Sequence, residues 1–134
     1  YRSGLEMKLM VVLDKHPNII EWSSEQVIIP YYKRIEQREA RYFLDFYFKI
    51  KIGEVIKEFI MEVKPHNQTI DPASKPAHGN KKKSTIIYEQ TMFITNTDKW
   101  EAAKKWCIEQ KRVKNREIQF IIITEQNIDK ILTS

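Results

Sequence analysis

The chain has 134 residues, of which 42% are hydrophobic and 31% are charged, a balance that indicates a globular fold rather than a disordered chain. No stretch approaches the ~20 apolar residues that cross a bilayer, so we expect no membrane partner. Lysine and arginine number 23 against 18 aspartate and glutamate residues, and the net charge of +5 favours a polyanionic partner. The single cysteine, Cys107, excludes an internal disulfide framework and a cysteine-based zinc finger.

The first half of the chain is predicted to form one helix and then several strands. Apolar residues at the spacing of one helical face predict a helix over 3–14, which Ser3 and Glu6 would open as a capping box. A polar loop is expected over 33–41. Segments rich in aromatic and β-branched residues predict strands over 19–23, 26–32, 41–51 and 57–64.

The second half opens with a long basic loop over 65–84, which contains three prolines and a run of lysines. Two helices are expected next, one over 85–95 and a second that Asp98 would cap. A strand over 118–124 and a short terminal helix complete the chain. This order of elements predicts an α/β fold with a mixed sheet.

Asp45 lies within the aromatic stretch RYFLDFYFK, where a carboxylate is unusual because strands are depleted in aspartate and a buried charge is unfavourable. In the next predicted strand, Glu62 and Lys64 share one face, since side chains alternate along a strand. A hairpin that turns at Gly53 and Glu54 would place Asp45 opposite Glu62, because the two residues are equally far from the turn.

Two opposed carboxylates repel each other, so this arrangement favours a bound divalent cation. Hard oxygen ligands suit Mg²⁺, for which Mn²⁺ would be a substitute. Lys64, on the same face, can neutralise developing charge or hold an attacking water. A metal, two acids and a lysine are the groups that hydrolysis of a phosphodiester requires.

Each of these residues also has a simpler structural interpretation. Glu6 can serve only the capping box, Asp45 can pair with Arg41, and Glu62 with Lys64 can form a solvated strand face. We favour the metal site because the predicted hairpin brings Asp45, in the middle of an aromatic strand, close to Glu62 and Lys64 of the next strand.

The order of several motifs resembles the PD-(D/E)XK nucleases. The motifs are YRSGLE at the start of the first helix, EW before QVIIPYY, RYFLDF, IMEVKP, and the later KWEAAKKWC and FIIITEQNI. This order is most similar to the TnsA-type endonucleases and the head completion nucleases of T-even-type tailed phages. The resemblance implies a restriction-endonuclease-like core, with a mixed sheet flanked by helices, in a single nuclease domain over 1–134.

The resemblance also implies a Mg²⁺-dependent DNA endonuclease with little sequence specificity, which acts in phage head completion after DNA packaging. Asp45, Glu62 and the backbone carbonyl of Val63 would hold the metal, and Glu6 would assist through a water or a second metal. Lys64 would complete the catalytic set.

Basic residues outside this set are candidates for contacts with the phosphates of double-stranded DNA, although a lysine run can also simply keep a loop solvated. The candidates are Arg2, Arg41, Lys75, Lys81, Lys82 and Lys83. Glu89 and Gln90, on the helix expected after the loop, are candidate helpers of the catalytic set.

Two other functions stay open from the sequence. One is a structural head-completion or DNA-end-binding factor with little nuclease activity, and the other is a TnsA-like transposition endonuclease. Portal and neck proteins are candidate partners, and the expected place of action is the host cytoplasm during phage assembly. Homodimer formation and presence in the virion are left open.

Overall fold

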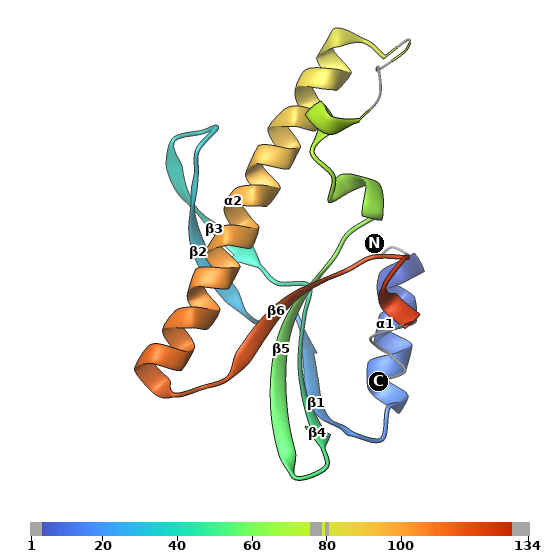
Figure 1. Ribbon diagram of the computed structural model, residues 1–134, viewed down its shortest axis with the longest axis vertical. Coiled ribbons are helices and arrows are strands. Elements are labelled where there is room, and N and C mark those ends of the chain that lie inside the picture. The colour runs from blue at the N-terminus through green and yellow to red at the C-terminus, as the bar shows by residue number, and fades with distance from the viewer. Residues whose placement is uncertain (1–3, 76–78, 80, 130–134) are drawn as a thin grey trace.

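The computed structural model of the protein describes residues 4–75, 79 and 81–129, and it has an α/β fold (Figure 1). The elements in the first half are α1 (Gly4–Lys15), β1 (Ile19–Ser24), β2 (Ile28–Lys33), β3 (Arg38–Phe43), β4 (Phe46–Ile52) and β5 (Val55–Val63). The elements in the second half are the 3₁₀ helices η1 (His66–Gln68) and η2 (Pro72–Ser74), then α2 (Lys83–Lys114) and β6 (Ile118–Ile123). None of the described helices is both long and apolar enough to span a membrane.

The main sheet has four strands in the order β1-β4-β5-β6, and a second sheet is the β2-β3 hairpin. The strand β5 pairs antiparallel with β4 and parallel with β6, so the main sheet is mixed, as the sequence predicts. Because parallel neighbours need a crossover, α2 carries the chain from the end of β5 back to the start of β6. The expected α/β fold with a mixed sheet is confirmed.

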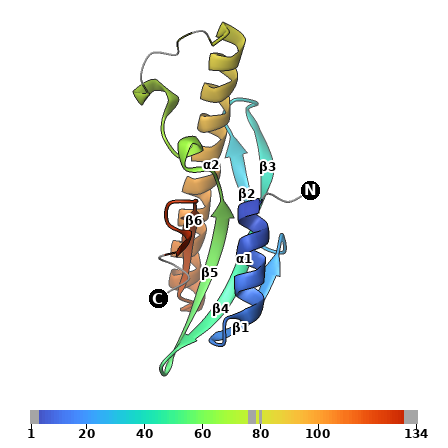
Figure 2. The same cartoon turned by 90° about the vertical axis from the view of Figure 1, so that its right-hand side faces the viewer.

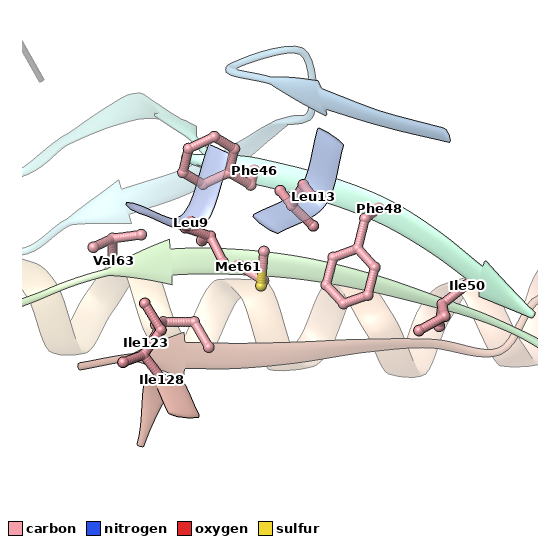
Figure 3. Close-up of a cluster of buried hydrophobic side chains, with 9 residues drawn as sticks. All are labelled: Leu9, Leu13, Phe46, Phe48, Ile50, Met61, Val63, Ile123 and Ile128. Carbon is pink, nitrogen blue, oxygen red and sulfur yellow. The ribbon is translucent and has the colours of Figure 1, made fainter. Parts of the chain in front are cut away.

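The two long helices cover opposite faces of the main sheet (Figure 2). Leu9 and Leu13 of α1 pack on Phe46, Met61 and other inward-facing strand residues, which form one buried cluster (Figure 3). The second cluster lies on the α2 side, where Ala103 contacts a set that includes Tyr42, Leu44, Ile60 and Ile118. Alternation along β5 therefore directs Met61 to α1 and Ile60 to α2, as expected for side chains on a strand.

The hairpin of β4 and β5 has the predicted turn. The strands pair from Phe46 with Met61 to Ile52 with Val55, and Gly53 in the turn has a φ of 61°. A residue at this φ is normally glycine because a side chain is disfavoured there. One residue beyond the Phe46–Met61 pair, the same register places Asp45 opposite Glu62.

The expected strand over 41–51 is wrong, because the chain bends at Leu44 and Asp45 and forms two strands, β3 and β4. At the bend, the backbone bonds across to the β1–β2 connection, from Leu44 N to Val27 O and from Glu25 N to Asp45 O. The loop expected over 33–41 is also too long. Its turn covers only residues 34–37, where Gln37 has a φ of 50°, and β3 begins at Arg38.

The two helices expected over 85–95 and from Asp98 are one continuous helix of 32 residues. Asp98 does not cap a second helix, because its carboxylate accepts bonds from the backbone N–H and the Nε of Arg34. The helix ends at Asn115, whose φ of 52° allows its N–H to bond to the carbonyl of Lys111. Ser3, the other half of the predicted first capping box, lies outside the described residues.

The described part of the predicted loop over 65–84 contains two short helices. Its two 3₁₀ helices are held locally, and the Asp71 side chain accepts a bond from Ala73 N at the start of η2. The carboxylate of Glu125 accepts the His66 N–H and fixes the beginning of the segment. In Figure 1, η1 and η2 lie beside the N-terminal half of α2.

Candidate active site

The carboxylate of Asp45 lies at the bend between β3 and β4 and turns toward the end of β5. Its Oδ2 accepts a hydrogen bond of 2.7 Å from the backbone N–H of Val63. Burial and the charges of Glu62 and Glu6 raise the pKa of Asp45 to about 6, against the lowering effect of the Val63 bond and of Lys64. Glu6, Glu62 and Lys64, the other residues of the predicted catalytic set, therefore all lie close enough to act on Asp45 electrostatically.

The carboxylate of Glu62 is buried on the α2 side of the sheet, with 4% of the residue exposed. The indole Nε1 of Trp100, on α2, donates a hydrogen bond to its Oε2. Lys64 Nζ lies 4.0 Å from the other carboxylate oxygen, Oε1. These two contacts hold a buried charge in one orientation, which a catalytic or metal-binding carboxylate requires.

Two further residues approach this pair of acids. The hydroxyl of Tyr42, on β3, is buried with no hydrogen-bond partner among the described residues. Burial and the charge of Glu62 raise its pKa, so the phenol stays protonated. Lys99 Nζ lies 5.5 Å from the centre of the Tyr42 ring, and burial lowers its pKa while Glu62 and Asp45 oppose that effect. A second lysine therefore faces the acids from α2.

Glu6 lies in the first turn of α1, and its charge reaches Asp45 across the end of the sheet. It does not join Asp45 and Glu62 in a cage, because the described part of the chain contains no group of three or more acidic, histidine or cysteine side chains that could hold a metal ion. A role for Glu6 through a water or a second metal stays a prediction.

The residues present fit a Mg²⁺ ion that completes its shell from the substrate. Mg²⁺ usually takes one or two carboxylates and keeps several waters or phosphate oxygens. Asp45 and Glu62 supply two hard oxygen donors, and Asp45 is buried close enough to the charge of Glu62 for its pKa to rise. A divalent cation would compensate this accumulated negative charge.

The candidate DNA-binding residues fall in different places. Arg41 is exposed on β3 and stacks on Phe43, with its guanidinium carbon 5.3 Å from the ring centre. Lys81 Nζ forms an ion pair of 2.8 Å with Glu89, which is one of the two candidate helpers. The other candidate helper, Gln90, is exposed on α2. Lys82 and Lys83 are exposed at the start of α2, Lys75 follows η2, and Arg2 lies outside the described residues.

The sequence analysis missed the α2 and β3 residues of the site. Nothing local in the sequence marks Trp100, Lys99 or Tyr42 as residues of a site. Trp100 contacts Glu62 from 38 positions later in the chain, so no local pattern in the sequence brings the two residues together.

Comparison with known proteins shows the family of the chain. The family described as "TnsA-like endonuclease N terminal" matches residues 16–125. The chain belongs to this TnsA-like endonuclease family. Its fold is accordingly of the restriction-endonuclease-like class, and the chain carries a nuclease domain.

The same TnsA-like chain is similar to a curated protein of Enterobacteria phage T4 that is named "Head completion nuclease". The two are 39% identical over 129 residues, which cover 96% of this chain and 79% of the phage T4 protein. No solved structure matches the chain.

Proposed function

We propose that this TnsA-like domain is a Mg²⁺-dependent DNA endonuclease that acts in phage head completion after DNA packaging. The observation that carries the proposal is the opposed pair Asp45 and Glu62, with Lys64 Nζ 4.0 Å from the Glu62 carboxylate. The name of the phage T4 relative supports the biological role. We place its action in the infected host cell, with portal and neck proteins as candidate partners.

In this proposal Asp45, Glu62 and the carbonyl of Val63 hold the cation, with Mn²⁺ as a substitute for Mg²⁺. The bound cation would supply charge compensation at the scissile phosphate and would lower the pKa of a water for in-line attack. The Val63 N–H and the Trp100 indole fix the two carboxylates before substrate arrives, so little reorganisation is needed.

The lysines have separate tasks in the reaction. Lys64, beside Glu62, orients the attacking water or neutralises charge on the phosphate as it develops. Lys99 approaches from α2 and attracts a phosphate oxygen into the same space. Both act on phosphate groups, and such contacts carry no sequence information, so we propose little sequence specificity.

The test is cleavage of supercoiled plasmid by purified protein in Mg²⁺, in Mn²⁺ and in EDTA. We expect nicking in either metal, none in EDTA, and none from Asp45→Ala, while Glu54→Ala at the exposed hairpin turn cleaves like wild type. DNA binding without cleavage in any metal would reject the nuclease and favour a DNA-end-binding factor of the phage head.

A further inference from the structure

A cavity of about 250 Å³ lies between α2 and the segment that follows β5. Residues of η1 and η2 form one wall, and α2 residues from Tyr88 to Asn96 form the other. Asn96 precedes Trp100 by four residues, which is one turn or about 6 Å along a helix. Since Trp100 bonds to Glu62, the cavity begins one helical turn along α2 from a residue that contacts a candidate catalytic carboxylate.

Asn96 places a polar atom, unpaired among the described residues, at one end of this cavity. The residue is 3% exposed, and its side-chain oxygen has no hydrogen-bond partner within the described part of the chain. A buried polar atom without a partner destabilises a protein, so a sequence that keeps one usually has a functional reason. Here the unused oxygen belongs to a residue that lines the cavity.

The other lining residues specify the chemistry of a ligand. Asn67 and Gln68 add two more amides, each with donors and acceptors of the kind that match the edge of a nucleobase. Tyr88 and Phe93 supply aromatic rings on which a base can stack. Lys75, after η2, provides a cation for the attached phosphate.

We infer that this cavity binds one unpaired nucleotide of the DNA, next to the phosphate that is cut. Its volume is below the ~300 Å³ at which sites for drug-sized ligands begin, and this suits a single base. The inference rests on the proposed function and names its substrate class. The substrate is duplex DNA that carries a single-stranded segment, such as an overhang or a gap, in preference to blunt duplex.

The experiment measures binding in EDTA, where no cleavage occurs, so its outcome does not depend on catalysis. Two duplexes are compared by fluorescence anisotropy, one blunt and one with a short single-stranded overhang that contains 2-aminopurine. The variants are Tyr88→Ala and its control Ile87→Ala, which removes an exposed side chain of the same helix that does not line the cavity. Both side chains are more than half exposed, so neither change threatens the fold.

We expect the overhang duplex to bind about tenfold more tightly than the blunt duplex, in line with the stacking of one base on an aromatic side chain. Tyr88→Ala should abolish this preference and the change in 2-aminopurine fluorescence, while Ile87→Ala should keep both. Equal affinity of wild type for the two duplexes would overturn the inference and leave the nuclease proposal intact. A preserved preference in a protein that never cleaves would overturn only the nuclease proposal.

Asn96→Leu separates a binding role from a structural one. Because the asparagine oxygen is unpaired, the substitution should leave the melting temperature equal to that of wild type or higher, while the overhang preference falls. Unchanged overhang preference in a folded Asn96→Leu protein would contradict the assignment of Asn96 to the ligand.

Discussion

Asp45 lies in an environment that disfavours the charged form of its side chain. A carboxylate that only stabilised the fold would lie in water or against a cation, and its pKa would be low. Burial, together with the nearby charges of Glu62 and Glu6, instead raises the pKa of Asp45 to about 6. Such an unfavourable environment for a charged group is typical of active sites, where the folded protein gives up some stability to keep reactive groups together.

The raised pKa predicts that Asp45 lowers stability near neutral pH when no metal is bound. Below the usual value of 3.8, the carboxyl is protonated in both folded and unfolded chains. Between pH 3.8 and about 6, Asp45 is ionised in the unfolded chain but still largely protonated in the folded chain. The free energy of unfolding therefore falls as the pH rises through this range. Asp45→Asn should therefore be more stable than wild type at neutral pH, by roughly 2–3 kcal/mol.

Urea denaturation in EDTA, at a pH below 4 and near neutrality, measures this difference directly. Asp45→Asn should increase the free energy of unfolding only at the higher pH. The control Glu54→Gln, at the exposed turn, should not change the free energy of unfolding at either pH. Excess Mg²⁺ should stabilise wild type but not Asp45→Asn. An Asp45→Asn protein that is less stable than wild type at neutral pH would contradict the pKa argument.

The sequence predicts which strand residues form the site, but it does not predict which residues of α2 contact them. Asp45, Glu62 and Lys64 could be brought together because hairpin register follows from the position of the turn. Trp100, which comes 38 positions after Glu62, could not, because its contact depends on how a helix crosses the sheet. Packing of that kind is a tertiary property that no local pattern encodes.

Among the elements, α2 determines the shape of the site. Its 32 residues extend about 48 Å, so the helix crosses the sheet and continues beyond it beside the 66–75 segment (Figure 1). Its C-terminal end is tied to the sheet by Arg116, which donates two bonds to Glu58 on β5, at 2.8 and 2.9 Å. Tyr47 on β4 donates to the same carboxylate at 2.6 Å.

Breaking this contact should loosen the junction of α2 and β6. Arg116→Met leaves the Glu58 carboxylate partly buried without its cation, so we expect a loss of about 1–3 kcal/mol in unfolding free energy. Glu58→Gln in the same background should recover part of the loss, as a double-mutant cycle would show. Additive effects of the two changes would mean that the ion pair contributes nothing.

The errors in the predicted elements have local physical causes. The aromatic run over 41–51 has uniform strand propensity, so the bend at Asp45 is invisible until its bonds to the β1–β2 connection are known. In α2, Asp98 and Glu101 have the spacing of a capping box, but Arg34 occupies the Asp98 carboxylate. Only the absence of proline and glycine between 85 and 114 indicated a continuous helix.

On the scale of the whole molecule, basic residues collect where α2 begins. Lys81, Lys82 and Lys83 lie there, and we propose that they contact the DNA backbone. Changing all three to alanine should weaken DNA binding and reduce the slope of affinity against salt by about 2, since Lys81 already pairs with Glu89.

The matched control changes Lys104, Lys105 and Lys114 to alanine, which removes the same charge from the far end of α2. Binding titrations of duplex DNA over a range of salt concentrations give the slope for each protein. A slope for the Lys81–Lys83 variant that equals the control would show that position is irrelevant and only net charge matters.

In the proposed mechanism, Lys64 and the two carboxylates form a centre that hydrolyses DNA. The most direct measurement is the rate of nicking of supercoiled plasmid by Lys64→Met at saturating DNA with Mg²⁺, compared with Lys51→Met, an exposed lysine on β4. We predict that Lys64→Met lowers the rate by at least about 100-fold, with DNA affinity unchanged, while Lys51→Met matches wild type. Cleavage by Lys64→Met at the wild-type rate would contradict the assignment of this site as the catalytic centre.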